Sequence, residues 1–210
     1  MIPFDIISDP ICPWCFIGKT TLDRALELTP DHPFEIEWHP FQLNPDMPPE
    51  GMPRRAYLEQ KFGGKDNALK VYGEIDAKAR EEGLELNFEA IEKTPNTLNA
   101  HRLIFWAGIE KCQNQVVQSI FEAYFLEGRD ISDLEVLADI ADSAGIDAAL
   151  VLRLLKTDED LAEVRLRDKT FRDMGVTSVP TYLIAREHAV PGVQATELWT
   201  KVIEEAKAVA

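Results

Sequence analysis

Two cysteines three positions apart, Cys12 and Cys15, are the residues of this chain best suited to chemistry. Their C-x-x-C motif follows a mostly apolar segment, residues 2–7, and opens a segment with helical spacing, residues 13–28. The pattern therefore predicts a motif at a strand-to-helix junction. Paired thiols at such a junction point to thiol–disulfide chemistry.

The start of the predicted helix favours an anion at Cys12. The first helical turn exposes unpaired N–H groups and the positive end of the helix dipole, which together stabilise a thiolate. Pro13 suits the first helical position, because its fixed φ fits a helix and its missing N–H would have had no partner there. Cys15 follows one turn later on the same face. We therefore predict that Cys12 attacks and that Cys15 resolves the mixed disulfide.

The motif has two other interpretations, half of a zinc site and an inert buried pair. A zinc site of this kind usually needs a second cysteine pair, and Cys112 is the one further cysteine. The histidines at positions 32, 39, 101 and 188 lack H-x₃₋₅-H spacing. Redox chemistry is favoured, no metal site is predicted, and Cys112 is expected to be a partly buried bystander, but the sequence leaves both alternatives open.

The composition limits the range of partners. The chain has 210 residues, 45% hydrophobic and 28% charged, as in an ordinary globular protein. Its 37 acidic and 22 basic residues give a net charge of −15. Such a surface repels the phosphates of nucleic acids and anionic membranes, so we expect neither as a partner.

The amino-terminal residues, MIPFDIISDP, lack the basic start, the apolar core and the cleavage site of a secretory leader. No stretch approaches the roughly eighteen apolar residues of a membrane span. We therefore expect a cytoplasmic protein. Structural disulfides are rare in the cytosol, so the C-x-x-C is expected to be catalytic, redox-sensing or metal-binding.

The rest of the chain alternates between strand and helix signals. Residues 34–39 alternate apolar and polar side chains, which predicts a half-buried strand and completes a β-α-β unit. Residues 40–53 are dense in proline, and we expect a loop without regular structure. From residue 54 to about 174 the apolar stripes are those of helices, with breaks at 63–64, 94–96, 128 and 145.

Strand character returns near the carboxyl end. Residues 181–184 and 188–190 are predicted strands, and a last helix is predicted over about 196–208. The order is thus β-α-β, a long helical block, then β-β-α. We expect residues 1–53 and 175–210 to form one α/β domain, with residues 54–174 as a helical insertion.

This order, with a C-x-x-C at the first helix and Val179-Pro180 before the last unit, resembles the thioredoxin plan. Four segments carry a closer resemblance: SDPICPWCFIGK, EWHPFQLNPDMPPEG, TPNTLNAHRL and GVTSVPTYLI. Over essentially its whole length the chain is similar to the cytosolic FrnE-like branch of the DsbA family. The resemblance implies an α/β thioredoxin-like fold with a large all-helical insertion. It also implies a thiol–disulfide oxidoreductase acting on proteins or small molecules.

The resemblance also implies details of the site. The bond between Val179 and Pro180 should be cis, and its loop should lie against the C-x-x-C, where Val179 could pair with an extended substrate backbone. No histidine separates the cysteines, and the Trp14 indole cannot supply positive charge, so we expect a weaker oxidant than DsbA. No cofactor is expected beyond the redox-active disulfide, with glutathione as a potential co-substrate.

Polar residues in two segments are candidates for lining the substrate site. His39, Gln42 and Asn44 follow the second strand, and His39 could assist proton transfer at Cys15. The second segment is Asn96, Asn99 and His101. Asn96 has the type and position of a helix N-cap, whereas in related glutathione-dependent isomerases a segment like this one closes over the thiol site.

Two other functions remain open on the sequence. The first is a glutathione-dependent isomerase or transferase of the 2-hydroxychromene-2-carboxylate isomerase type, in which a serine near the Cys12 position activates glutathione. Two cysteines in place of that serine argue against it. The second is a peptide-binding chaperone module that uses the same groove without redox chemistry.

Overall fold

A four-stranded sheet in the order β2-β1-β5-β6 forms the centre of the protein in the computed structural model, which describes residues 1–209. The strands are β1 (Ile2–Ser8), β2 (Phe34–Pro40), β5 (Thr181–Ile184) and β6 (His188–Pro191). Strand β2 runs parallel to β1, whereas β5 pairs with β1 and β6 pairs with β5 in antiparallel fashion. The predicted β-α-β and β-β-α units therefore share one sheet.

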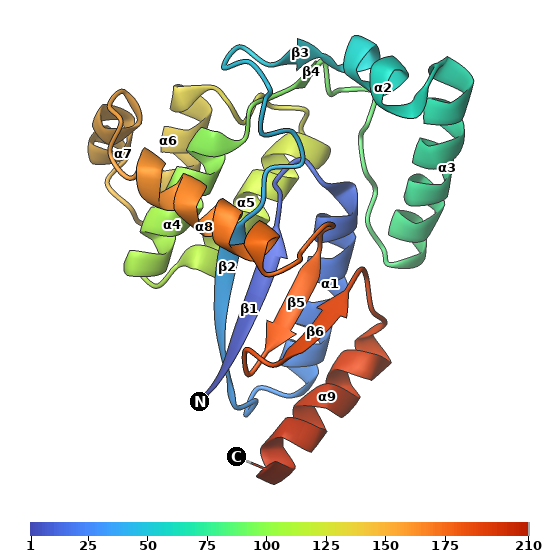
Figure 1. Cartoon of the computed structure of the whole chain (residues 1–210), viewed down its shortest axis with the longest axis vertical. Coiled ribbons are helices and arrows are strands. Elements are labelled where there is room, and N and C mark those ends of the chain that lie inside the picture. Colours follow the sequence, from blue (N-terminus) through green and yellow to red (C-terminus); the bar gives the residue numbers. More distant parts are fainter. Residues whose placement is uncertain (210) are drawn as a thin grey trace.

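Helices α1 (Pro13–Leu28) and α9 (Thr196–Val209) cover one face of this sheet (Figure 1). Buried aromatic side chains fill the layer between them. The ring of Trp199 lies 5.7 Å from that of Phe4 and 4.6 Å from that of Tyr182, all nearly excluded from solvent. Burial of such rings is a large stabilising term, and it fixes α9 against β1 and β5.

The opposite face is covered by helices of the insertion (Figure 1). Helices α4 (Leu98–Ile109) and α8 (Leu161–Asp173) pack on β2, and α5 (Gln113–Phe125) packs on α4 and also contacts α1. Helices α6 (Leu134–Ser143) and α7 (Ala148–Leu155) lie further out, on the left of Figure 1. Among the described residues, no helix has both the length and the apolar character to cross a bilayer.

Helices α2 (Arg54–Phe62) and α3 (Lys65–Glu81) lie at the other end of the insertion, above and beside α1 (Figure 1). Gly63 and Gly64 join them with φ angles of 72° and 128°, which non-glycine residues rarely adopt. This tight corner sets α2 across the amino-terminal side of α1, where the C-x-x-C lies.

The structure corrects two expectations about regular structure. The proline-rich segment is not wholly irregular, because Pro40 ends β2 and Met52–Pro53 forms β3. Strand β3 pairs with β4 (Lys93–Thr94), which lies in the stretch expected to be helical. Two-residue strands show no periodicity, and proline is tolerated in a short edge strand because its missing N–H need not be paired.

Candidate active site

Cys12 occupies the N-cap of α1, as its sequence position predicts. The turn before it is closed by a bond from the Cys12 N–H to the Asp9 carbonyl at 2.9 Å, and the Cys15 N–H donates to the Cys12 carbonyl at 3.0 Å. The thiol is only 4% exposed and donates to the Val179 carbonyl at 3.6 Å. The cysteine at the helix start thus contacts the loop before β5.

Cys15 lies in the first turn of α1, completely buried. Burial raises its pKa well above the ordinary value, and the hydrogen bond and charge of the neighbouring Cys12 raise it further. The Ser8 side chain and the Asp9 backbone act in the opposite direction. Both cysteines are free thiols in this structure. The buried Cys15 therefore holds its proton more firmly than an ordinary thiol.

The loop before β5 packs closely on α1. The bond between Val179 and Pro180 is cis, as the family resemblance implies. A Cβ atom at Gly18 would overlap the Tyr182 hydroxyl and lie 3.1 Å from Pro180 Cγ, so only glycine permits this approach. The loop and the first turns of the helix therefore form one packed unit.

A cavity of about 270 Å³ opens beside the C-x-x-C motif. Its walls come from the C-x-x-C segment, helices α2 and α3, the loop before β5, and Tyr124 of α5. A second, larger hollow of about 610 Å³ lies on the other side, between α3 and the loop before α9. Both are lined by Trp14, Ser178 and Val179. The half-buried indole of Trp14 therefore borders two hollows.

The two hollows differ in charge. In the larger one the charged residues are Lys78 and Glu82, which bind each other at 2.8 Å. Of the residues that the structure describes, the charged ones lining the cavity beside Cys12 are two cations, Arg54 and Lys61, and no carboxylate. Neither cation has a carboxylate within 4 Å among the described residues.

The residues of α2 that line this cavity were missed by the sequence analysis. Arg54, Tyr57 and Lys61 have the spacing i, i+3, i+7, which places them on one face of a helix. The sequence did contain a signal for these residues, because a spacing usually occupied by apolar side chains carries polar ones here. That the face turns toward Cys12 follows only from the packing of α2.

Asp9, immediately before the motif, is a fully buried carboxylate that organises the loops around the cysteines. One oxygen accepts from the Leu43 N–H at 2.6 Å, and the other accepts from the Ile11 N–H at 3.5 Å. His101, a predicted lining residue, is buried with Nε2 at 3.7 Å from Asp9. His101 thus lies behind the loop rather than in the cavity.

The four predicted amides also bind mainly to the chain itself. Gln42 donates to Asn96 and Thr97 at 3.4 and 3.5 Å, and Asn99 accepts from Arg102 at 3.0 Å. Asn96 is not the N-cap of α4, which is Thr97. It stands one residue earlier, but its side-chain oxygen still accepts a hydrogen bond of 2.9 Å from the Leu98 N–H. Asn96 therefore satisfies a backbone donor at the start of the helix, as a cap residue does.

Asn44 is the predicted amide nearest to the cavity. It accepts a hydrogen bond of 3.0 Å from Tyr57, whose side chain lines the wall beside Cys12. Asn44 itself lines an adjoining hollow of about 450 Å³. It therefore helps to position a cavity residue.

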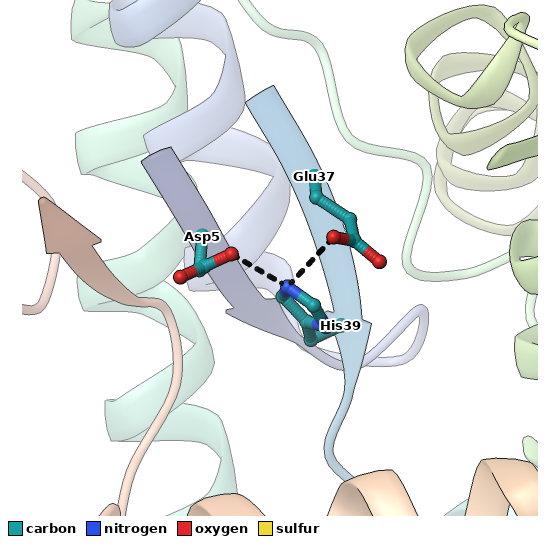
Figure 2. A group of neighbouring side chains, drawn as sticks. All are labelled: Asp5, Glu37 and His39. Atoms are coloured by element: carbon teal, nitrogen blue, oxygen red, sulfur yellow. Dashed lines mark hydrogen bonds and ion pairs between the residues drawn. The ribbon is translucent and has the colours of Figure 1, made fainter. Parts of the chain in front are cut away.

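His39 lies on the sheet face opposite α1, in the cluster shown in Figure 2. Its Nε2 lies 2.9 Å from Asp5 and 3.7 Å from Glu37, and its ring packs 4.7 Å from that of Phe171 in α8. Asp5 and Glu37 are directly opposite each other in the β1–β2 register. The structure therefore places His39 in a polar cluster between strands rather than in the cavity at Cys12.

Three potential metal-ligand atoms of Asp5, Glu37 and His39 lie within 4.8 Å of one another. Each carboxylate also faces an arginine. Arg167 binds Glu37 at 2.7 Å, and Arg186 lies 3.8 Å from Asp5. The charges of the cluster are therefore balanced within the chain. Neither Cys12 nor Cys15 belongs to this group.

Cys112 is half-buried at the N-cap of α5 and donates to the Ala107 carbonyl at 3.7 Å. Burial raises its pKa, and the charge of Glu110 adds to the effect. Cys112 therefore holds its proton more firmly than an ordinary thiol, and it lies at the start of α5, whereas the other two cysteines lie at the start of α1.

Residues 4–204 match the family model of the DSBA-like thioredoxin domain. The match spans nearly the whole chain, and the chain belongs to this family. It is a DsbA-like oxidoreductase with a C-x-x-C motif. The predicted thioredoxin-like fold with its helical insertion is thereby confirmed.

Three relatives illustrate the similarity. YwbO of Bacillus subtilis is 26% identical over 206 residues, which cover 95% of this chain and 94% of that protein. The crystal structure of a probable DsbA oxidoreductase from Streptomyces coelicolor superposes with a TM-score of 0.88 at 26% identity, covering 100% of this chain and 92% of that one. The cytosolic disulfide reductase DsbM of Pseudomonas aeruginosa shares the fold, with a TM-score of 0.73, 15% identity, and coverage of 99% and 100%.

Proposed function

We propose that this protein is a cytoplasmic thiol–disulfide oxidoreductase of the FrnE-like branch, in which Cys12 attacks and Cys15 resolves. The observation that carries the proposal is the difference between the two thiols. Cys12 stands at the helix start beside a cavity, whereas Cys15 is wholly buried and its pKa is raised. An attacking thiol needs access to substrate, and a resolving thiol needs access only to its partner.

The exchange balances in both directions. The Cys12 thiolate attacks one sulfur of a substrate disulfide, and the other sulfur leaves as a thiolate that takes up a proton. Cys15 then loses its proton and attacks the Cys12 sulfur, which releases the second substrate thiol and forms the Cys12–Cys15 disulfide. The substrate gains two electrons and the protein loses two. The reverse sequence oxidises a substrate dithiol.

The surroundings of the motif support an enzyme that is less oxidising than DsbA. Trp14 supplies no positive charge next to Cys12, and the two cations that line the same cavity, Arg54 and Lys61, belong to α2 and not to the motif. A less stabilised reduced form favours a lower reduction potential. The fold of DsbM, a cytosolic disulfide reductase that has also been determined with GSH, supports a reducing role and glutathione as a co-substrate.

Substrate binding is proposed at the two hollows beside Trp14, which Val179 and the loop before β5 also line. Of the predicted lining residues, Asn44 contributes through Tyr57. The proposed architecture keeps residues 1–53 and 175–210 as the thioredoxin-like domain and residues 54–174 as the insertion, with α2 and α3 supplying part of the cavity wall.

Trapping experiments with single variants test this assignment. On treatment with glutathione disulfide, Cys15→Ser should accumulate one glutathione at Cys12, because the resolving thiol is gone. Cys12→Ser should form no such adduct at Cys15, and Cys112→Ser should behave as the wild type. Intact-protein and peptide mass spectrometry read the outcome. An adduct at Cys15 in Cys12→Ser, or a wild-type rate of disulfide exchange in that variant, would contradict the proposed roles.

A further inference from the structure

The charge of the cavity beside Cys12 is unusual for this chain. Acidic residues outnumber basic ones by 37 to 22, yet the charged side chains lining this cavity are two cations, Arg54 and Lys61. A surface of net charge −15 repels anions at a distance. A local pair of unneutralised cations therefore marks a place where an anion would be bound.

Of the two cations, Arg54 gives the stronger evidence for an anion site, because this charged residue is only 6% exposed. Its Nη1 donates to the Tyr124 hydroxyl at 3.2 Å, and the guanidinium lies 5.0 Å from the centre of the Tyr72 ring. Its Nη2 is buried and has no hydrogen-bond partner among the described residues. Buried charges are normally paired, because removing them from water is costly.

Arg102 shows how this fold treats a buried arginine whose role is structural. Its side chain donates to Asn99 and to four backbone carbonyls in the last turn of α7 and the loop before α8, at 2.8–3.3 Å. Every nitrogen of that guanidinium is used. Arg54, by contrast, lines a cavity, and its buried Nη2 has no hydrogen-bond partner among the described residues.

Lys61 and Tyr57 continue the same face of α2. Lys61 is exposed and donates to the Tyr57 hydroxyl at 2.7 Å, which leaves two ammonium protons free. The cavity volume of about 270 Å³ suits a small molecule rather than a folded protein surface. Cys12 lines the same cavity, so an anion at α2 and a sulfur at Cys12 can belong to one small ligand.

We propose that the Arg54–Tyr57–Lys61 face of α2 binds a carboxylate of a small thiol or disulfide whose sulfur reacts at Cys12. This assignment rests on the proposed oxidoreductase function and adds the substrate class. Charged hydrogen bonds of this kind are among the strong ones, and a guanidinium pairs well with a carboxylate. The same site would give no binding advantage to a disulfide that lacks a carboxylate.

Two small disulfides of similar size provide the test: dithiodipropionate, which carries carboxylates, and hydroxyethyl disulfide, which is neutral. The rate at which each oxidises the reduced protein is followed by free-thiol titration. The ratio of the two rates should fall about tenfold in Arg54→Gln and in Lys61→Gln, as expected for loss of a charged hydrogen bond. High salt should lower the wild-type ratio as well.

Arg55→Gln is the matched control, since it removes the same charge from the same helix. Arg55 is 80% exposed, pairs with Glu59 and does not line the cavity, so the ratio should not change. Lys61→Gln keeps the test valid if Arg54→Gln folds poorly. An unchanged ratio in Lys61→Gln and in folded Arg54→Gln would overturn the anion site alone. If neither disulfide oxidised Cys12 and Cys15 in the wild type, the oxidoreductase function would be overturned, and the anion site with it.

Discussion

Two polar regions of the molecule differ in how their charges are satisfied. In the cluster of Asp5, Glu37 and His39, each group faces an opposite charge or a charge-balancing partner. In the cavity beside Cys12, Arg54 and Lys61 face no carboxylate within the described part of the chain. In the first region the carboxylates are paired within the chain, although His39 Nδ1 has no hydrogen-bond partner among the described residues, whereas in the second region a buried cation keeps an unused donor.

This difference separates residues that stabilise the fold from residues available to a substrate. Buried groups that satisfy one another contribute through stability, and removing one leaves its partner uncompensated. Groups left unsatisfied beside a reactive thiol lower stability and provide recognition instead. Substitutions in the two regions should therefore have opposite profiles, one affecting stability and the other affecting exchange.

The largest expected effect on stability is that of His39→Ala. The substitution leaves the buried Asp5 carboxylate without its partner at 2.9 Å, and the free energy of unfolding should fall by about 3 kcal/mol. Urea denaturation measures this loss, and His39→Gln, which can still donate to Asp5, should recover part of it. A tenfold slower exchange without loss of stability would instead support proton transfer by His39.

Arg54→Met should show the opposite profile. Methionine keeps the apolar stem between the neighbouring rings and removes a buried charge that lacks a carboxylate partner. The free energy of unfolding should change by less than about 1 kcal/mol, while selectivity for the carboxylate-bearing disulfide is lost. Denaturation and rate measurements on the same preparation test this. A loss of about 3 kcal/mol would show that Arg54 is mainly structural.

The raised pKa of Cys15 predicts that the stability of the reduced protein depends on pH. Its folded-state pKa is raised above 9.0, so the unfolded chain loses this proton first as the pH rises. The stability that it contributes is complete below pH 9.0 and is lost above it, by up to about 1.4 kcal/mol per pH unit. Denaturation between pH 8 and 10 should therefore show a steeper decline in wild type than in Cys15→Ala. Equal slopes would contradict the raised pKa.

Tyr182→Phe should have the smallest effect. The hydroxyl is buried beneath the site and has no hydrogen-bond partner among the described residues. Burial raises its pKa well above the ordinary value, and the nearby Cys15 and Cys12 add to this. Removing an unpaired hydroxyl should leave stability unchanged or raise it by about 1 kcal/mol. A loss of more than about 1 kcal/mol would indicate a missing partner.

The sequence predicted the parts of the site that are local. The strand before Cys12, the helix after it and the break at Gly63-Gly64 each follow from a few adjacent residues. The family resemblance added the cis bond before Pro180. Two-residue strands such as Met52–Pro53 were not predicted, because they are too short to show a period.

Side-chain partners across the fold could not be predicted in this way. His39 lies near the end of β2 and His101 in the first turn of α4, which made them candidates for the site, but the buried carboxylates of Asp5 and Asp9 face them. Arg54 and Lys61 lie on a helix whose orientation is set by packing against α3 and the β3–β4 pair. The face that reaches Cys12 is therefore a property of tertiary structure.

The reduction potential of the Cys12–Cys15 pair tests the central claim most directly. Equilibration in glutathione buffers, with intact mass as the readout, should give a reversible intramolecular disulfide. The potential should lie between about −270 and −120 mV and below that of DsbA. A protein that forms no such disulfide, and instead binds glutathione stably without oxidising or reducing it, would contradict the oxidoreductase function and favour a glutathione-dependent isomerase or transferase.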